Sequence, residues 1–304
     1  MSKSTISTFQ LFSLYPDVET ARKYLESRLW KNGATCPKCK GKEKITTRKG
    51  GYYRCNSCHL DFTVRTGTIF ERSHVPLHKW IYAMYLLVTA RKGISSLQLG
   101  KEIGITQKSA WFVLQRLREA CGGDTTVLRG IVEMDEVYIG GKEKNKHMKV
   151  RIVGDHGLPE KIAVVGMREK NGHVKAKHVV STGGRAMEQL ALQNIRKGST
   201  VHTDENYSYY RFKEFYSHKT VNHSQDRYVH NGVTTNGVES VFALLRRGLH
   251  GVYHKASKKH IGRYIDEFAW RLNEGNVKRH SLDRLDSFVD AVTGKRITYE
   301  RLIA

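Results

Sequence analysis

Two C-x-x-C pairs constrain the fold of this 304-residue chain more than any other feature of its sequence. Fifteen residues separate the first pair, Cys36 and Cys39, from the second, Cys55 and Cys58. A structural zinc ion takes four ligands at the corners of a tetrahedron, and two such knuckles joined by a hairpin supply four thiolates. The spacing therefore predicts structural Zn²⁺ rather than a coincidental pairing of cysteines. Four sulfur ligands leave no open position for catalysis at the metal.

The fifth cysteine, Cys121, makes the count odd. Because the first residues, MSKSTISTFQ, lack the apolar core of a signal peptide, we expect reduced thiols rather than disulfides. No stretch of the sequence approaches the roughly 18 apolar residues of a membrane span. We therefore expect a cytoplasmic, nucleoid-associated protein with no membrane partner.

The charge of the chain indicates its partners. Lysine and arginine number 52 against 29 acidic residues, which gives a formal net charge of +23. Such an excess attracts polyphosphate chains, and the release of counterions supplies affinity that does not depend on sequence. Hydrophobic residues make up 39% of the chain, enough to bury cores and to exclude a disordered protein. A ribosome-type protein or a basic membrane-surface protein would share this charge.

The N-terminal part of the chain alternates between helical and β-type patterns. We place an N-terminal helical segment at 1–33, in which helical spacing over residues 8–30 predicts one short helix with Asp17 as its N-cap. Residues 34–72 contain three short β-type runs, and Gly50 and Gly51 mark the turn between two of them. We expect a zinc ribbon over 34–72. The three runs cover residues 45–47, 52–54 and 62–64.

Residues 73–122 show the punctuation of a helix-turn-helix. An apolar helix over 76–91 is followed by helices that begin after Ser95 and Thr106, with Gly104 in the turn between them. We expect this segment to bind DNA. The cations expected on the exposed side of its last helix are Lys108 and Arg116.

After Gly122 the composition shifts toward β-branched runs. Strands followed by interleaved helices predict a mixed α/β sheet with helices packed on it. We place this domain at 123–280 and a C-terminal tail at 281–304. The predicted strands are 130–139, 161–167, 174–180 and 199–203, and the predicted helices are 186–196, 238–247 and 259–273.

Three acidic residues in this α/β half suit metal-assisted phosphoryl transfer, which needs carboxylates from several elements around two divalent ions. Asp135 lies inside an apolar strand, where a charge is costly unless it binds something. Asp204 follows the last predicted strand, and Glu239 lies one turn into a predicted helix.

Each of these residues also has a local interpretation. Asp135 would be tolerated on an edge strand that faces water. Asp204 would serve as the N-cap of a helix over 205–215. Glu239 follows Asn236 by three residues, which is the spacing of a capping box.

The order of several motifs resembles the zinc-ribbon-bearing insertion-sequence transposases of the fifteen-ninety-five family. The resemblance runs from about residue 10 to residue 275 and rests on CPKC, CNSC, VEMDEVYIGGKEKNKH, STVHTDENYSYY and TTNGVESVFALLRRGLHGVYHKASKKHIGRYIDEFAWRLN. It implies an RNase H-like mixed sheet with flanking helices, preceded by a zinc ribbon and a helix-turn-helix. It further implies Asp135, Asp204 and Glu239 as catalytic ligands of Mg²⁺ or Mn²⁺. Asn236 remains an alternative third ligand, because some relatives have Asn or His at that position.

The stretch after the third acidic residue is basic and contains no Asp or Glu between Ser240 and Tyr264. Such a stretch either binds the phosphodiester backbone or forms a solvated helix face. We expect it to bind DNA. The cations concerned are Arg246, Arg247, Lys255, Lys258 and Lys259.

Together these features predict a DDE-type transposase of an insertion sequence. It would cleave the element ends and transfer their 3′-hydroxyl groups into target DNA, as a homodimer or higher oligomer assembled on double-stranded DNA in a synaptic complex. Two alternatives keep parts of this interpretation. One is a DNA-binding regulator whose α/β half only binds a ligand or partner, and the other is a structure-selective nuclease that joins no strands.

Overall fold

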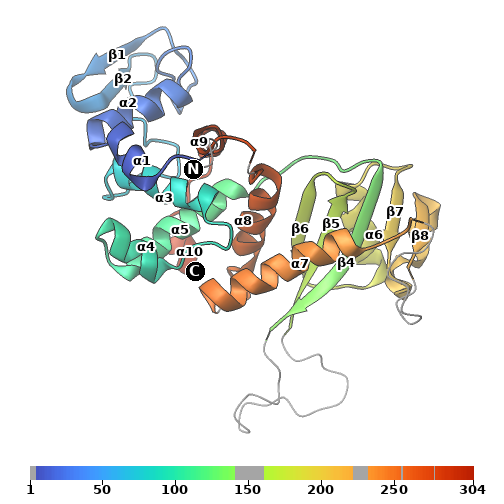
Figure 1. The fold of residues 1–304 in the computed structure, drawn as a ribbon. Coiled ribbons are helices and arrows are strands. Elements are labelled where there is room, and N and C mark those ends of the chain that lie inside the picture. The colour runs from blue at the N-terminus through green and yellow to red at the C-terminus, as the bar shows by residue number, and fades with distance from the viewer. Residues whose placement is uncertain (1–4, 141–160, 222–231, 255, 277) are drawn as a thin grey trace. The chain divides into compact units, whose positions relative to one another are not determined.

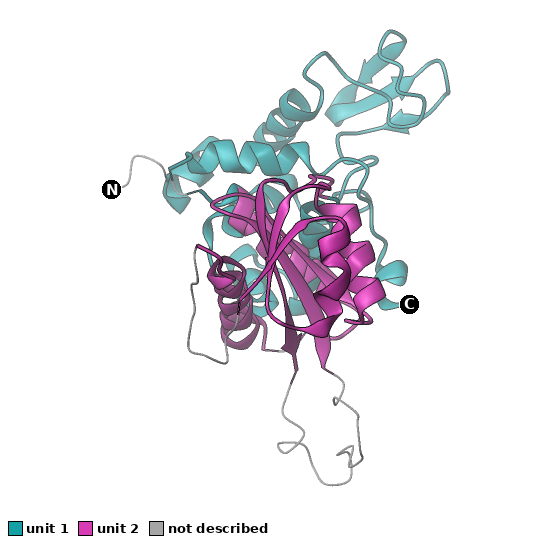
Figure 2. Ribbon diagram, turned by 90° about the vertical axis from the view of Figure 1, so that its right-hand side faces the viewer, with its two compact units in different colours: residues 1–123, 274–304 teal, residues 124–273 magenta. Residues whose placement is uncertain are grey.

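The chain folds into two compact units, shown in Figure 2. One unit combines Met1–Gly123 with Glu274–Ala304, and the other is Asp124–Asn273. The computed structural model describes residues 5–140, 161–221, 232–254, 256–276 and 278–304. Among these residues, no helix has both the length and the apolar character that crossing a membrane requires.

The first unit begins with two helices and a small antiparallel sheet (Figure 1). The sequence predicted one helix here, but two form. Asp17 accepts a hydrogen bond from the Thr20 amide at 2.7 Å and is the N-cap of the second helix. Gly50 and Gly51 have φ of 70° and 75°, which allows the tight reversal between the first two strands. The elements are α1 (Thr8–Leu14), α2 (Val18–Leu29), β1 (Ile45–Arg48), β2 (Tyr52–Cys55) and β3 (Asp61–Phe62).

The predicted helix-turn-helix is confirmed. The side chains of Ser95 and Thr106 each accept an amide hydrogen bond from three residues further on, and so begin α4 and α5. Gly104 ends α4 in the left-handed conformation, with φ of 62°. The helices of this segment are α3 (Leu77–Thr89), α4 (Ser96–Ile103) and α5 (Gln107–Cys121).

Residues 281–304 are not the tail that we expected from the sequence. They contain α9 (Ser281–Asp290) and α10 (Tyr299–Ile303), and α9 packs on α2 and α3 in the first unit. Its inward face follows helical spacing, so it buries an apolar stripe. The fully buried residues of this stripe are Leu285, Phe288 and Val289, and Val292, just after the helix, is fully buried as well.

The second unit contains a five-stranded mixed sheet in the order β6-β5-β4-β7-β8. Strands β4, β5 and β6 pair antiparallel, whereas β7 is parallel to β4 and β8 is parallel to β7. This is the RNase H-like arrangement that the resemblance implied. The strands are β4 (Ile131–Ile139), β5 (Ile162–Glu169), β6 (Val174–Val179), β7 (Thr200–Thr203) and β8 (Ser217–Thr220).

Helices cover both faces of this sheet. Because side chains alternate along a strand, Val132 and Met134 of β4 join one core, and Val137 joins the other. The first core includes residues of α6 (Gly184–Asn194) and of the 3₁₀ segment η4 (Tyr207–Glu214). The second includes residues of α7 (Asn236–Gly248), the π-helical turn η6 (Leu249–Tyr253) and α8 (Ile261–Glu274). Even-numbered residues of β4 thus face α6 and η4, and odd-numbered ones face α7 and α8.

Candidate functional site

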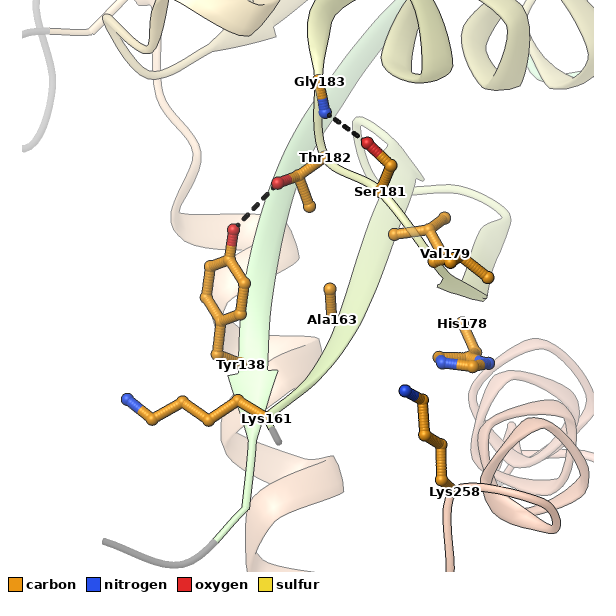
Figure 3. A pocket seen from close by; sticks show the side chains of 10 residues that line it. Tyr138, Lys161, Ala163, His178, Val179, Ser181, Thr182, Gly183 and Lys258 are labelled. Carbon is orange, nitrogen blue, oxygen red and sulfur yellow. Dashed lines mark hydrogen bonds between the residues drawn. The ribbon is translucent and has the colours of Figure 1, made fainter. Parts of the chain in front are cut away.

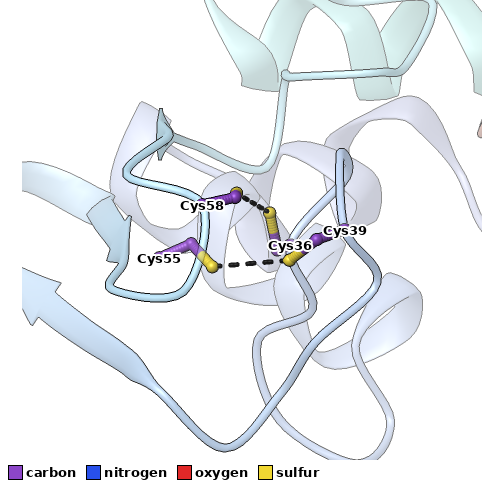
Figure 4. Close-up of side chains that lie close together, drawn as sticks. All are labelled: Cys36, Cys39, Cys55 and Cys58. Atoms are coloured by element: carbon purple, nitrogen blue, oxygen red, sulfur yellow. Dashed lines mark hydrogen bonds between the residues drawn. The ribbon is translucent and has the colours of Figure 1, made fainter.

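The four cysteines of the ribbon converge on one point, as Figure 4 shows. Their Sγ atoms all lie within 4.8 Å of one another, and the Cys36–Cys58 and Cys39–Cys55 pairs are 3.5 Å apart. Sulfurs at about 2.3 Å from a tetrahedral zinc lie roughly 3.8 Å from each other. The cluster therefore fits a structural zinc ion.

Local geometry in the two knuckles explains this convergence. In each knuckle the residue after the second cysteine has a left-handed backbone: Lys40 has φ of 62° and His59 has φ of 58°. The pKa of the Cys55 thiol is lowered to about 6, chiefly because the amide of Cys58 donates a hydrogen bond to its sulfur. A lowered pKa favours the thiolate, which is the form that binds zinc.

Asp135 lies on the central strand of the second unit, between β5 and β7, so the edge-strand interpretation is wrong. Its side chain is on the face that α7 covers. The pKa of its carboxyl group is raised to about 7, mainly by burial and in addition by the negative charges of Glu136, Asp204 and Glu239. The structure thus brings Asp204 and Glu239 within electrostatic range of Asp135.

These carboxylates are less tightly grouped than the cysteines. Within the described part of the chain, only the cysteine cluster has three or more His, Cys, Asp or Glu ligand atoms within 4.8 Å of one another. Carboxylates repel one another where no cation stands between them. The acidic group is therefore an electrostatically strained set that a divalent cation would stabilise.

Asp204 follows β7 directly, next to the parallel strand β4. One of its oxygens accepts the Asn206 amide hydrogen bond at 3.1 Å. Asn206 is the residue that caps η4, by accepting from the Ser208 amide at 3.0 Å. The interpretation of Asp204 as a helix N-cap is therefore wrong.

Glu239 lies in the first turn of α7. The hydroxyl of Thr235 donates to its carboxylate at 3.1 Å. Asn236 is the exposed first residue of the helix rather than its cap, so the expected capping box does not form. The negative charge of Glu239 contributes to the raised pKa of Asp135.

The sequence did not reveal the role of Glu133, which precedes Asp135 by two residues on the same face of β4. Its buried carboxylate accepts the Val238 amide hydrogen bond at 2.8 Å, at the start of α7. The helix has no side-chain cap from its own flank, so this distant carboxylate serves instead. A Cβ atom at Gly237 would collide with the Glu133 carboxylate, which explains the glycine there.

A second strand residue holds the same helix end. Arg168 lies opposite Glu133 in the β4–β5 register. Its guanidinium donates to the Gly237 carbonyl at 2.8 Å and to the Ser240 hydroxyl at 2.9 Å. Glu133 and Arg168 together fix where α7 begins, and hence where Glu239 lies. The sequence did contain one signal for the role of Glu133: it is a second acidic residue on the same face of the strand as Asp135.

Glu136 points to the opposite face of β4, toward η4. It accepts hydrogen bonds from the Asn206 side chain at 3.0 Å and from the hydroxyl of buried Tyr209. Burial raises its pKa, and the nearby charge of Asp204 adds to the effect. Glu136 thereby ties the segment after Asp204 to the central strand.

The predicted DNA-binding cations have different surroundings. Arg246 and Arg247 are exposed at the end of α7, and Lys258 and Lys259 are exposed before α8. Lys108 is exposed in the first turn of α5, with its ammonium 5.2 Å from the centre of a tyrosine ring. Lys255 lies outside the described residues.

The prediction that Arg116 is exposed for DNA binding is wrong, because only 5% of this residue is exposed. Its guanidinium lies 4.4 Å from the centre of the Phe112 ring and donates to the carbonyls of Ile69 and Glu71 at 2.8 and 2.9 Å. These acceptors lie more than forty residues away in the chain, so helical spacing gave no sign of them. Arg116 stabilises the first unit and does not face DNA.

A pocket of about 330 Å³ lies at the end of β4 and β6, beside the start of α6 (Figure 3). Its lining includes Lys161, His178 and Lys258 and contains no carboxylate. Burial lowers the pKa of His178, and the positive charge of Lys258 lowers it further. A polar pocket with basic walls attracts anions such as phosphate. Hydroxyl groups of Tyr138 and Thr182, 3.0 Å apart, also line it.

Two family models match this chain. Residues 127–273 match the ISXO2-like transposase domain, and residues 16–61 match the transposase zinc-ribbon domain. The chain belongs to this insertion-sequence family of transposases. The resemblance seen in the sequence is thereby confirmed.

Individual relatives of the transposase are more distant. A protein of the transposable element ISH50 from Halobacterium salinarum, itself uncharacterised, is 29% identical over 260 residues, which are 80% of this chain and 86% of that one. The protein chain in the crystal structure of the Mos1 strand transfer complex is 13% identical to this one, with a TM-score of 0.28. The match covers 69% of this chain and 76% of that one. A pre-cleavage Mos1 transpososome is 14% identical, with a TM-score of 0.26, and covers 72% and 79%.

Proposed function

We propose that this transposase cleaves the ends of its element and joins the freed 3′-hydroxyl groups to target DNA by two-metal phosphoryl transfer. Asp135, Asp204 and Glu239 would be the ligands of Mg²⁺ or Mn²⁺. The observation that carries the proposal is the electrostatic coupling of Asp135 to the other two carboxylates, which come from a different strand end and from a helix. Carboxylates from separate elements are the donor set that such ions require.

Bound divalent ions would supply Lewis acidity at the scissile phosphate and lower the pKa of the attacking water or hydroxyl. The residues of the chain hold this arrangement in place. Glu133 and Arg168 fix the start of α7, which keeps Glu239 near Asp135. Glu136 fixes the segment that follows Asp204.

We further propose double-stranded DNA as the partner, both at the element ends and at the target. Exposed Arg246, Arg247, Lys258 and Lys259 and the basic pocket beside α6 support a path for the phosphodiester backbone. Recognition of two ends at once requires two catalytic units, so a homodimer or higher oligomer on nucleoid DNA is part of the proposal.

Single alanine substitutions test the catalytic residues. Asp135→Ala, Asp204→Ala and Glu239→Ala should each abolish nicking of a supercoiled plasmid that carries an element end, while a gel-shift assay still shows DNA binding. Glu205→Ala is the matched control, because Glu205 is an exposed carboxylate next to Asp204 and should keep full activity. If Glu239→Ala still nicks DNA and Asn236→Ala does not, the third ligand is Asn236.

A second experiment separates transposition from simple nuclease action. Pre-cleaved ends with a labelled 3′-hydroxyl should become joined to an unlabelled plasmid when Mn²⁺ is added. Nicking without any joined product would make the protein a nuclease and overturn the strand-transfer part of the proposal.

A further inference from the structure

Two exposed tyrosines lie directly beyond Asp204. Tyr207 is 84% exposed and Tyr210 is 55% exposed, although large aromatic side chains are usually covered. Their rings are stacked, with centroids 5.6 Å apart and planes inclined by 16°. Tyr207 is the first residue of η4 and follows Asp204 by three positions. An aromatic surface of this kind next to a candidate active site points to a binding partner.

The geometry of η4 explains the stacking. A 3₁₀ helix has three residues per turn, so side chains at positions i and i+3 eclipse each other. Tyr207, Tyr210 and Lys213 follow this spacing, and the Lys213 ammonium lies 4.0 Å from the centre of the Tyr210 ring. We refer to these three residues as the tyrosine column. Tyr210 is thus in contact with both of the other members, and Tyr207 is the first ring of the column.

The opposite side of η4 is anchored, so the column is held in place. Tyr209 and Phe212 are fully buried, and the Tyr209 hydroxyl donates to Glu136 on the central strand. Arg211 forms an ion pair with Glu188 of α6 at 2.9 Å. An exposed aromatic pair on an anchored segment provides a preformed surface, which lowers the entropy lost on binding.

We propose that Tyr207 stacks on an unpaired nucleobase of the DNA strand held at Asp204, and that Lys213 lies near the phosphates of that strand. This inference rests on the proposed function. Inside a duplex both faces of each base are covered by its neighbours, so away from the duplex ends a ring can reach only a base at an opened position. Stacking on aromatic side chains accepts any base, and a neighbouring cation suits the backbone. A nucleobase therefore fits the column better than a second protein surface does.

The test uses the full-length protein without Mg²⁺ or Mn²⁺, so that no cleavage is required. Fluorescence anisotropy compares a duplex that ends in three unpaired nucleotides with a fully paired duplex of equal length. The wild-type protein should prefer the unpaired end. Tyr207→Leu should lower this preference about tenfold, because it keeps an apolar side chain but removes the aromatic ring. Tyr207→Phe should retain the preference, since stacking needs no hydroxyl group.

Two controls make the result specific. Val127→Ala removes another exposed apolar side chain, 51% exposed, from the same unit, and it should leave the preference unchanged. Because Tyr207 is so exposed, neither of its variants should change the melting temperature of the protein.

Three outcomes would contradict the inference. In the first outcome, both Tyr207→Leu and Tyr207→Phe keep the preference of the wild type. In the second, the wild type itself shows no preference for the unpaired end. In the third, Tyr207→Leu converts an oligomer to a monomer in sedimentation. The last outcome would assign the column to a second copy of the chain. If the wild type nicks plasmid DNA in these cases, the inference fails while the proposed function stands.

Discussion

The cysteine cluster and the carboxylate group are built by opposite means. The four thiols come from a segment that begins at Cys36 and ends at Cys58, and their sulfurs lie within 4.8 Å of one another. The carboxylates are spread from Asp135 to Glu239 over strands and a helix, and their mutual repulsion contributes to the raised pKa of Asp135. Ligands close in sequence are preformed by turn geometry, whereas distant ligands meet only after a whole sheet has folded.

This difference has an energetic consequence. Metal binding at the ribbon supplies folding free energy to a segment with a small core. The acidic group instead destabilises the fold until a cation arrives, because charge is buried without compensation. We therefore expect that removing a cysteine destabilises the ribbon, whereas removing a carboxylate of the acidic group stabilises the metal-free second unit.

The largest expected effect is at the ribbon. Cys55→Ser should abolish binding of one zinc equivalent and leave residues 34–61 open to proteolysis, because zinc contributes about 10 kcal/mol or more in small zinc modules. The measurement is zinc content together with limited proteolysis followed by mass spectrometry. Cys121→Ser is the matched control and should keep the zinc. A ribbon that resists protease without zinc would remove the contrast between the two sites.

The next effect concerns the helix that carries Glu239. Glu133→Ala leaves the buried Val238 amide without its acceptor, which should lower the free energy of unfolding by about 1–3 kcal/mol. The rate of nicking should fall by more than this loss of stability alone explains, because Glu239 is displaced. Gly237→Ala should act similarly, because its Cβ would displace the Glu133 carboxylate.

Gly262→Ala is the matched control for this pair of variants. Gly262 is the second residue of α8, as Gly237 is of α7, and a Cβ atom there meets nothing within 4 Å. Urea unfolding and plasmid nicking measure both effects. Equal behaviour of the two glycine variants would show that Glu133 does not position α7.

A substitution at Asp135 should have a smaller effect, and it should raise stability rather than lower it. Asp135 has a pKa of about 7 in the folded protein against 3.8 in an unfolded chain, so the folded state binds more protons between these values. Without divalent ions its contribution to stability is therefore greatest below pH 4 and is lost as the pH rises to about 7. Asp135→Asn should stabilise the metal-free second unit at pH 8 by on the order of 1 kcal/mol, and less at pH 5.

Hydrogen exchange of β4 and β5 at the two pH values measures this difference. Mn²⁺ should increase protection in the wild type and leave Asp135→Asn unchanged. Protection of the wild type that rises between pH 5 and pH 8 without Mn²⁺ would mean that the acidic group does not destabilise the fold.

The smallest effect is expected for a single surface cation. Lys258→Ala should weaken DNA binding a few-fold and reduce the slope of log affinity against log salt by about one. Lys197→Ala, which removes another exposed charge elsewhere in the second unit, should change neither quantity. Anisotropy titrations over a range of salt concentrations provide the measurement. Equal slopes for both variants would place the DNA path away from the pocket beside α6.

Much of the secondary structure was predictable because its signals are local. The caps at Ser95 and Thr106, the turn at Gly50 and four of the five strands of the second unit lie where the sequence placed them. Strand β8 was missed because Ser217–Thr220 is short and polar, with no apolar alternation. Burial of Arg116 was missed because its acceptors are carbonyl groups from a distant loop.

The sequence by itself determined the zinc ligands, the helix-turn-helix and, through its ordered motifs, the transposase family. Only the tertiary structure decided that Glu133 caps α7 and that Glu136 holds the segment after Asp204. The physical reason is distance along the chain. A knuckle is closed by hydrogen bonds between neighbours, whereas the amide that Glu133 accepts from lies 105 residues away and is placed only by the packed sheet.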